Sequence, residues 1–326
     1  MKDIQQYHQL FSDFLVKKPF RKEPFNLYEP ADYILSIGGK RLRPIFVLLG
    51  CGLYKDDVNV ALSASMAIEV FHNFTLLHDD IMDQAVLRRG KPTVHKKYNI
   101  NTAILSGDVM MIMSYQYLLD YKDPSLSKEL MTIFNKMAFE VCEGQQLDVD
   151  FESRQDVTIS EYLHMITLKT SVLIASAIQI GSILGGATLD DQKHLYEFAK
   201  NFGIAFQLQD DILDTFGDTV DVGKKIGGDI LRNKKTYLYL KALELADKHQ
   251  QDRLTSLYQE NSDTEDTIKI DTVISIFKDV NVLEYSRQLI EAYRDLSISH
   301  LLACDIPDES KSEYKNLVDG LIFRNS

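Results

Sequence analysis

Residues Phe74 to Asp83 read Phe-Thr-Leu-Leu-His-Asp-Asp-Ile-Met-Asp, three aspartates behind an apolar run of helical character. The pattern returns at Phe206 to Asp214, which read Phe-Gln-Leu-Gln-Asp-Asp-Ile-Leu-Asp. Residues four apart share a face of a helix, so the outer aspartates of each copy point the same way. Like charges at that spacing cost roughly 0.2–0.5 kcal/mol per pair. A cation offsets this repulsion directly, and oxygen-only ligands suit magnesium or calcium. The metal-ligand candidates are Asp79, Asp80, Asp83, Asp210, Asp211 and Asp214.

The chain around these two copies reads as helix throughout. It has 326 residues, 45% of them apolar, and no proline lies between Pro124 and Pro307. Such a stretch, rich in helix formers and free of helix breakers, predicts successive long helices. No linker of Gly, Ser or Pro divides it, so we expect an all-α fold and a single domain over residues 1–326. The longer expected helices run over residues 58–83, 102–121, 126–143, 159–184, 190–214, 236–258 and 282–304.

Charge and cysteine content narrow the function classes. The net charge is 36 − 48 = −12, which argues against general nucleic-acid binding. An anionic substrate must therefore be met by local basic residues or by metal. The scattered Cys51, Cys142 and Cys304 lack metal-site spacing and indicate reduced thiols in a cytoplasmic protein. The chain starts without an apolar signal core.

One segment is long enough to span a bilayer. Thr170 to Leu189 holds twenty residues without a charge. Its serines, glutamine and glycines, and the lack of aromatic or basic anchors on both sides, favour a buried helix of a large bundle instead. We therefore expect no transmembrane segment.

Basic residues gather near the acidic motifs in sequence. Residues 40–43 read Lys-Arg-Leu-Arg after a Gly-Gly pair, and Arg88-Arg89 follows the first acidic motif. Arginine forks suit phosphate oxygens, whereas ordinary surface pairing with aspartates is the alternative. His72 lies two turns before Asp79 on the same face, where a histidine alone is more often a core residue. These groups predict a site for two polyphosphates, together with Lys169, Lys224, Lys225, Lys234 and Lys235.

These motifs resemble the trans-type isoprenyl diphosphate synthases, or polyprenyl synthetases. The resemblance runs from about Gly38 to Leu238, with every motif in order. Besides the two acidic motifs it rests on five further stretches: Gly38–Pro44, Arg88–Thr93, Gly107-Asp108, Lys169-Thr170, and Gly223–Lys225 with Asn233-Lys234.

The resemblance implies a bundle of long helices around a deep central pocket, usually in a homodimer. It also implies condensation of isopentenyl diphosphate with an allylic diphosphate (dimethylallyl, geranyl or farnesyl), with about three Mg²⁺ ions as cofactor. Asp79, Asp83 and Asp210 would ligate Mg²⁺ directly, and the other three aspartates partly through water. Arg88, Lys169, Lys224 and Lys234 would hold the allylic diphosphate. Lys40, Arg43, His72 and Arg89 would hold isopentenyl diphosphate. Thr170 and Gln207 would flank the reacting carbons.

Two further expectations concern a lid and the product length. The Gly- and Lys-rich stretch from Gly217 to Lys235 is a candidate lid over the diphosphates, and either Lys224 or Lys225 would touch phosphate. Phe74 lies five residues, or about 7.5 Å, before Asp79 and would be the floor for the growing chain. Within the resembled family an aromatic there accompanies short products.

Two neighbours of Phe74 narrow the expected product length. The non-aromatic Thr75 favours geranylgeranyl (C20) over farnesyl (C15) diphosphate as the product, and Phe71, one turn further along the helix, would block longer chains. The alternative is that Phe74 only packs the core. Other functions remain open at this stage: a longer-chain synthase, a class I terpene cyclase, a metal-dependent phosphohydrolase using His72 and His78, or a catalytically silent partner subunit.

Overall fold

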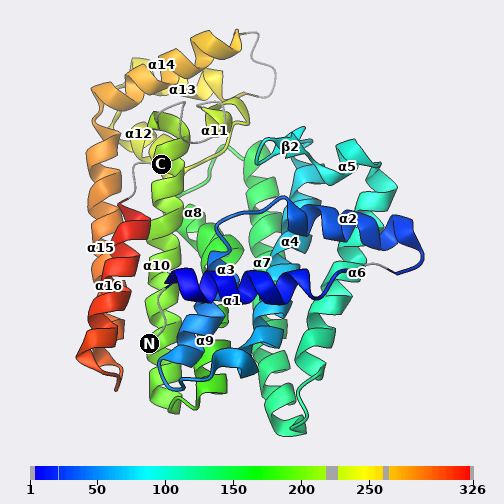
Figure 1. Cartoon of the computed structure of the whole chain (residues 1–326). Coiled ribbons are helices and arrows are strands. Elements are labelled where there is room, and N and C mark those ends of the chain that lie inside the picture. The colour runs from blue at the N-terminus through cyan, green and yellow to red at the C-terminus, as the bar shows by residue number, and fades with distance from the viewer. Residues whose placement is uncertain (1–3, 21, 218–226, 260–263, 324–326) are drawn as a thin grey trace. The chain divides into compact units, whose positions relative to one another are not determined.

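A computed structural model describes residues 4–20, 22–217, 227–259 and 264–323. Within these ranges the regular secondary structure is helical, apart from an antiparallel ribbon of two two-residue strands, β1 (Leu87–Arg88) and β2 (Lys91–Pro92) (Figure 1). The predicted all-α class is confirmed. The expected central pocket stays a prediction.

The chain divides into two compact units. The first comprises residues 1–136 and 176–196, and the second comprises residues 137–175 and 197–326. The expectation of a single domain over residues 1–326 stays a prediction.

The first unit is built on two long helices that pack side by side, α4 (Leu62–Met82) and α6 (Ile100–Leu119). The Ser63 hydroxyl donates to the Tyr117 carbonyl at 2.8 Å, and the His78 ring nitrogen Nε2 lies 3.2 Å from the Ile104 carbonyl. The start of one helix therefore meets the end of the other, and the pair is antiparallel. The remaining elements of this unit are α1 (Ile4–Val16), α2 (Phe25–Ser36), α3 (Leu42–Gly52), η1 (Val58–Ala61), α5 (Val94–Lys97), α7 (Pro124–Ser153) up to residue 136, α9 (Val172–Gly185) from residue 176 and α10 (Leu189–Phe216) up to residue 196.

A glycine makes the close approach of α4 and α6 possible. A Cβ atom built on Gly107 would lie 2.2 Å from His78 Nε2, which no real side chain tolerates. The Gly107 motif of the sequence therefore has a packing reason: it admits the imidazole that precedes the first aspartate.

The second unit carries the other acidic motif on α10 (Leu189–Phe216). Phe198 and Phe202 of this helix are fully buried, and the Ser297 hydroxyl of α15 donates to the Phe198 carbonyl at 2.8 Å. The unit also contains α7 (Pro124–Ser153) from residue 137 onward, α8 (Ile159–Ile166), a π-helical turn η2 (Thr167–Ser171), α9 (Val172–Gly185) up to residue 175, α11 (Gly228–Leu231), α12 (Tyr237–Leu245), α13 (Lys248–Leu257), α14 (Asp266–Asp279), α15 (Val282–Ala303) and α16 (Asp308–Ile322).

Two expected boundaries are wrong, and one expected helix contains an irregular turn. The helix expected over 236–258 is broken after Leu245, because Asp247 caps a new helix with Gln250 in a reciprocal capping box. The helix expected over 159–184 contains the π-helical turn, a feature that often marks functional segments. The helix expected over 126–143 continues to Ser153, and its added turns carry site residues described below.

In the part of the chain that the structure describes, two helical stretches are long and apolar enough to cross a membrane, Val58–Met82 and Ile159–Gly185. In each of them 72% of the most apolar window is buried inside the protein. Core helices of large bundles have this property, in line with the expectation for the uncharged segment.

Candidate active site

The first acidic motif occupies the carboxyl end of α4, and its three aspartates differ in environment. Asp79 and Asp83 are half-buried, and the Asp83 N–H, which caps the helix, donates to the Asp79 carbonyl at 2.8 Å. Asp80 is only 2% exposed. One helical turn therefore presents two outer carboxylates toward solvent and turns the middle one inward.

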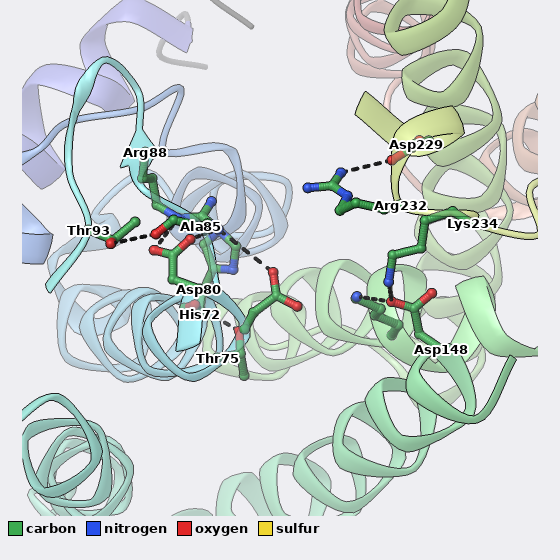
Figure 2. Close-up of polar contacts among 12 residues, drawn as sticks. His72, Thr75, Asp80, Ala85, Arg88, Thr93, Asp148, Asp229, Arg232 and Lys234 are labelled. Carbon is green, nitrogen blue, oxygen red and sulfur yellow. Dashed lines mark hydrogen bonds and ion pairs between the residues drawn. The ribbon is translucent and has the colours of Figure 1, made fainter. Parts of the chain in front are cut away.

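Arg88 holds the buried Asp80 in a bidentate pair. Its Nε and Nη2 donate to the two Asp80 oxygens at 2.8 Å each, and Nη2 lies 3.7 Å from Asp79 (Figure 2). Burial raises the pKa of Asp80, and the Arg88 hydrogen bonds offset part of that rise. Bidentate pairing of this kind fixes the orientation of the guanidinium group in addition to stabilising its charge. The predicted diphosphate-binding Arg88 is therefore already oriented beside the motif.

The β1–β2 ribbon positions both arginines. The Thr93 hydroxyl donates to the Ala85 carbonyl at 2.7 Å (Figure 2), and the Tyr33 hydroxyl donates to the Pro92 carbonyl at 2.7 Å. Arg89 has a positive φ of 52°, which turns its side chain toward the Gly38 carbonyl, to which it donates. A Cβ at Gly39 would collide with the Arg89 guanidinium, so the Gly-Gly pair makes room for this arginine.

A second basic group lies along α3 and α4. Arg43 Nη1 lies 3.1 Å from His72 Nε2, and burial together with Arg43 and Arg89 lowers the pKa of His72 well below its usual value. The imidazole is therefore neutral, and its Nε2 accepts a hydrogen bond from Arg43 Nη1. Arg41 instead pairs with Glu69 and the Leu35 carbonyl, a structural role that the sequence did not separate from its neighbours. Lys40 is exposed.

The middle aspartate of the second motif is also buried. Asp211 is 5% exposed; it accepts from the Tyr162 hydroxyl on one oxygen and from Gln207 Nε2 at 3.0 Å on the other. The Thr170 hydroxyl in turn donates to Gln207 at 3.0 Å. Burial and the nearby Asp229 raise the pKa of Asp211 well above its usual value. The predicted Thr170 and Gln207 are therefore together, joined to the motif through Asp211.

The outer aspartates of that motif, Asp210 and Asp214, are half-buried. Asp214 accepts the Asp229 N–H at 2.8 Å, and its carbonyl accepts the Gly227 N–H at 2.8 Å. The motif thus also fixes the start of α11. Both acidic motifs share one plan, in which the two outer aspartates are half-buried and the middle one is buried.

Two predicted lysines meet on a carboxylate that the sequence did not single out. Lys234 donates to Asp148 Oδ2 at 2.8 Å (Figure 2). Lys169 donates to the same oxygen at 2.7 Å, and Lys234 also donates to Glu152 Oε1 at 2.8 Å. Burial alone would raise the pKa of Asp148, but the two ammonium groups hold it below its usual value. Asp148 and Glu152 lie four residues apart and therefore on one face of α7. This pair of carboxylates on one helix face was the sequence signal that could have identified them as partners of the lysines.

The segment that carries Lys234 is anchored by two buried lysines. Asn233 has a positive φ of 57°; its side-chain oxygen accepts from Lys269 at 2.5 Å and its carbonyl accepts from Lys235 at 3.1 Å. Lys235 and Lys269 both lie over the Tyr258 ring, at 5.4 and 5.6 Å from its centre. Cation–π contacts of this kind stabilise a desolvated ammonium. Lys234 is therefore presented from a fixed backbone.

The predicted chain-length residues form part of the core of the first unit. Phe71 is fully buried and Phe74 is 8% exposed, and their ring centres lie 5.5 Å apart. Thr75 donates to the His72 carbonyl at 2.8 Å. Lys224 and Lys225, with part of the candidate lid, lie outside the described residues, and their roles stay predictions.

The donor chemistry of the aspartates fits Mg²⁺. The outer side chains are partly accessible carboxylates, and hard oxygen ligands are those that this ion prefers. Asp80 and Asp211 accept protein hydrogen bonds on both carboxylate oxygens. Their predicted binding of Mg²⁺ through water therefore competes for these oxygens with the hydrogen bonds from Arg88 and Tyr162. Among the described residues no three carboxylate, imidazole or thiol side chains gather as a ready-made metal site.

Comparison with known proteins places the chain in a family. The model of the polyprenyl synthetase family matches residues 24–277. The chain is 41% identical to the geranylgeranyl diphosphate synthase of Methanosarcina mazei over 222 residues, 68% of each chain. It is 36% identical to the geranylfarnesyl diphosphate synthase of Natronomonas pharaonis over 324 residues, 93% of this chain and 92% of that one.

A solved structure of a geranylgeranyl pyrophosphate synthase matches with a TM-score of 0.94 and 44% identity, covering 100% of both chains. The chain belongs to the polyprenyl synthetase family, and the family resemblance seen in the motifs is confirmed.

Proposed function

We propose that this chain condenses isopentenyl diphosphate with an allylic diphosphate and releases geranylgeranyl diphosphate (C20) and diphosphate. The chain is a prenyltransferase that makes a short-chain trans-prenyl diphosphate, as its relatives' names indicate. The enzyme class predicted from the motifs is thereby confirmed. The proposal further includes the C20 product length, Mg²⁺ as cofactor, the roles of the site residues, a homodimeric state and a cytoplasmic location.

The observation that carries the proposal is the shared plan of the two acidic motifs. In each motif the two outer aspartates are half-buried and the middle one is buried, and each motif lies in a unit that also holds cations predicted to bind phosphate. Arg88 stands beside Asp79, and Lys169 and Lys234 are paired on Asp148. Phosphohydrolase chemistry would instead call for further ligating histidines, and the described residues bring no such group together.

In the proposed mechanism the outer aspartates would hold Mg²⁺. When bound, these ions neutralise the charge of the allylic diphosphate and make it a leaving group. Arg88, Lys169 and Lys234 would add positive charge on the same diphosphate, and their carboxylate partners keep them oriented beforehand. Positive charge that is positioned in advance lowers the activation barrier, because these side chains need not move as the bond between the allylic carbon and the diphosphate breaks.

The second substrate would be held by Lys40, Arg43, Arg89 and His72. His72 is neutral and accepts from Arg43, so its other ring nitrogen carries a proton that can be donated. Loss of diphosphate leaves an allylic cation, the double bond of isopentenyl diphosphate attacks it, and a proton leaves to the released diphosphate. Because water would quench the cation, the apolar side chains around Phe74 exclude it.

Product length would be set by Phe74, about 7.5 Å along α4 from Asp79. Phe74 packs on Phe71 and against the edge of the His78 ring, 4.8 Å away, so its ring is fixed. A fixed ring serves as a floor for the growing chain. The non-aromatic Thr75 leaves room for a C20 product.

The direct test is to incubate the protein with Mg²⁺, isopentenyl diphosphate and each allylic starter, and to measure product chain length. We expect condensation and a C20 product. No condensation with any starter would overturn the proposal, and a cyclic hydrocarbon from allylic diphosphate alone would instead indicate a terpene cyclase. A product well beyond C20 would support a longer-chain synthase.

A further inference from the structure

A chain of hydrogen bonds in the second unit links four polar side chains. The Thr170 hydroxyl donates to Gln207 Oε1 at 3.0 Å, and Gln207 Nε2 donates to Asp211 Oδ1 at 3.0 Å. The Tyr162 hydroxyl donates to the other oxygen, Asp211 Oδ2. Tyr162, Asp211 and Thr170 are 2%, 5% and 8% exposed, so water has little access to these bonds. Asp211 therefore accepts from both sides, and it ends the chain that begins at Thr170.

Three elements bring these side chains together. Gln207 belongs to α10, Tyr162 to α8, and Thr170 to the π-helical turn η2. Gly203, one turn before Gln207, lets η2 approach α10 closely, because a Cβ atom at this position would lie 2.7 Å from Ser171 Cα. The packing of η2 against α10 therefore brings Thr170 within reach of the Gln207 amide.

The direction of the hydrogen bonds fixes how the Gln207 amide lies. Its nitrogen faces Asp211, and its oxygen faces the Thr170 hydroxyl. A hydroxyl group has one proton and two lone pairs, and an amide oxygen has two lone pairs. Because the Thr170 proton points at the amide oxygen, the oxygens of both side chains keep lone pairs that can stabilise a neighbouring positive charge.

We infer that Tyr162 is a positioning residue for the proposed condensation, and that through Asp211 it keeps the Gln207 amide oxygen available to the allylic cation. The inference rests on the proposed function, in which Thr170 and Gln207 would flank the reacting carbons. Dipoles that are oriented before the reaction stabilise charge that develops in the transition state. Without the Tyr162 hydroxyl, the Asp211 carboxylate is free to rotate, and the Gln207 amide can flip. A flipped amide places N–H groups where the oxygen stood, and these repel positive charge.

The main test is Tyr162→Phe, which removes one hydroxyl group and keeps the buried ring. We expect kcat to fall about tenfold, with little change in KM for either substrate, because the lost interaction acts on the transition state. The share of allylic diphosphate that ends as allylic alcohol should rise, since water that adds to a poorly held cation and loses a proton gives this by-product. An unchanged kcat with an unchanged alcohol share would overturn the inference.

A double-variant cycle shows whether Tyr162 acts through Gln207. Gln207→Met keeps the length of the side chain and removes both of its hydrogen bonds, so it should lower kcat by itself. Adding Tyr162→Phe to Gln207→Met should then cause no further loss, because residues that act as one unit are not additive. Losses that multiply in the double variant would show independent action and would overturn the inference.

The Mg²⁺ dependence of the rate separates this role from an effect on metal binding. The Mg²⁺ concentration needed for half-maximal rate should be the same in Tyr162→Phe and the wild type, because the outer aspartates of the motif are unchanged. A large increase in that concentration would show that the hydroxyl acts on the metal site through Asp211 and would overturn the inference.

Tyr314 provides a matched control in the same unit. It lies on α16, is 1% exposed, and its ring centre lies 6.3 Å from that of Phe198. Tyr314→Phe removes a buried tyrosine hydroxyl in the same way and should leave kcat and the alcohol share unchanged. Losses equal to those of Tyr162→Phe would assign both to general destabilisation and would overturn the positioning role.

The wild type keeps the two proposals apart. A wild type that condenses no substrates would refute the proposed function itself. An active wild type, with a Tyr162→Phe variant that matches it in kcat and alcohol share, would refute only the positioning role.

Discussion

At the scale of single residues, the three aspartates of each motif separate into two kinds. Asp80 and Asp211 are buried and give both oxygens to protein donors, whereas their neighbours are partly exposed. A carboxylate that is buried and hydrogen-bonded orients its donor, and an exposed one can take a metal ion. We therefore propose that Asp80 acts on the diphosphate through Arg88.

The variants Asp79→Ala and Asp80→Asn test this separation. Asp79→Ala should abolish condensation, because a proposed direct ligand is lost. Asp80→Asn should raise KM for the allylic diphosphate about tenfold, equivalent to about 1.4 kcal/mol, with a smaller change in the Mg²⁺ concentration needed for half-maximal rate. Steady-state kinetics at varied Mg²⁺ measures both.

Asp252→Asn on the exposed surface of α13 is the matched control and should leave both quantities unchanged. If Asp80→Asn weakened Mg²⁺ activation as strongly as an outer-aspartate variant, then Asp80 would be a ligand.

The pKa of Asp148 predicts a pH effect on stability. The folded pKa is depressed by Lys169 and Lys234, below the unfolded value of about 3.9. The ion pairs therefore stabilise the fold above about pH 4, and their contribution is lost as the pH falls through the folded pKa. Urea unfolding between pH 2 and pH 7 should show a shallower loss of stability in acid for Asp148→Asn than for the wild type. Equal acid slopes would contradict the assignment.

At the scale of elements, the segment from Gly227 to Thr236, which carries Lys234, is held in place by its neighbours. Its first residue bonds to the Asp214 carbonyl, and Asn233 is held by Lys235 from within the segment and by Lys269 from α14. A left-handed backbone conformation such as that of Asn233 costs free energy, and it persists only where contacts with surrounding residues hold it. Lys269 supplies that constraint although it lies 36 residues from Asn233.

Lys269→Met tests this anchor. The variant keeps the length of the side chain but removes the donor to Asn233, which should cost about 1–3 kcal/mol of stability. It should also raise KM for the allylic diphosphate, since Lys234 is then less well placed. Lys248→Met, at an exposed lysine of α13, should change neither quantity. Unchanged KM with lowered stability would show that the anchor is purely structural.

At the scale of the whole molecule, an apolar seam on α6 supports the proposed homodimer. Leu105, Ile112 and Leu119 are exposed by 58%, 64% and 53%, and they recur every seven residues, hence on one face. Phe139 of α7 is 64% exposed as well. Apolar side chains repeated at this spacing are typical of a helix that packs against a second helix.

Ile112→Glu should therefore shift the protein from dimer to monomer, because a charge in an apolar seam is left unpaired. Light scattering coupled to gel filtration measures the mass. Val16→Glu, at an apolar residue of α1 that is 79% exposed, is the control and should leave the mass unchanged. A wild type that elutes as a monomer would refute the dimer directly.

The sequence by itself determined the helical class, the family and the two acidic motifs, because these depend on residue types at fixed spacing along one helix. It also placed Lys169, Lys234, Thr170 and Gln207 among the site residues. The structure adds their partners.

Only the tertiary structure decided which carboxylates are buried, that Asp148 joins two lysines, and that Asp211 joins Tyr162 to Gln207. Lys234 and Asp148 are 86 residues apart in sequence. No local spacing encodes such a pair, because it forms only when packing of apolar helix faces brings distant helices together.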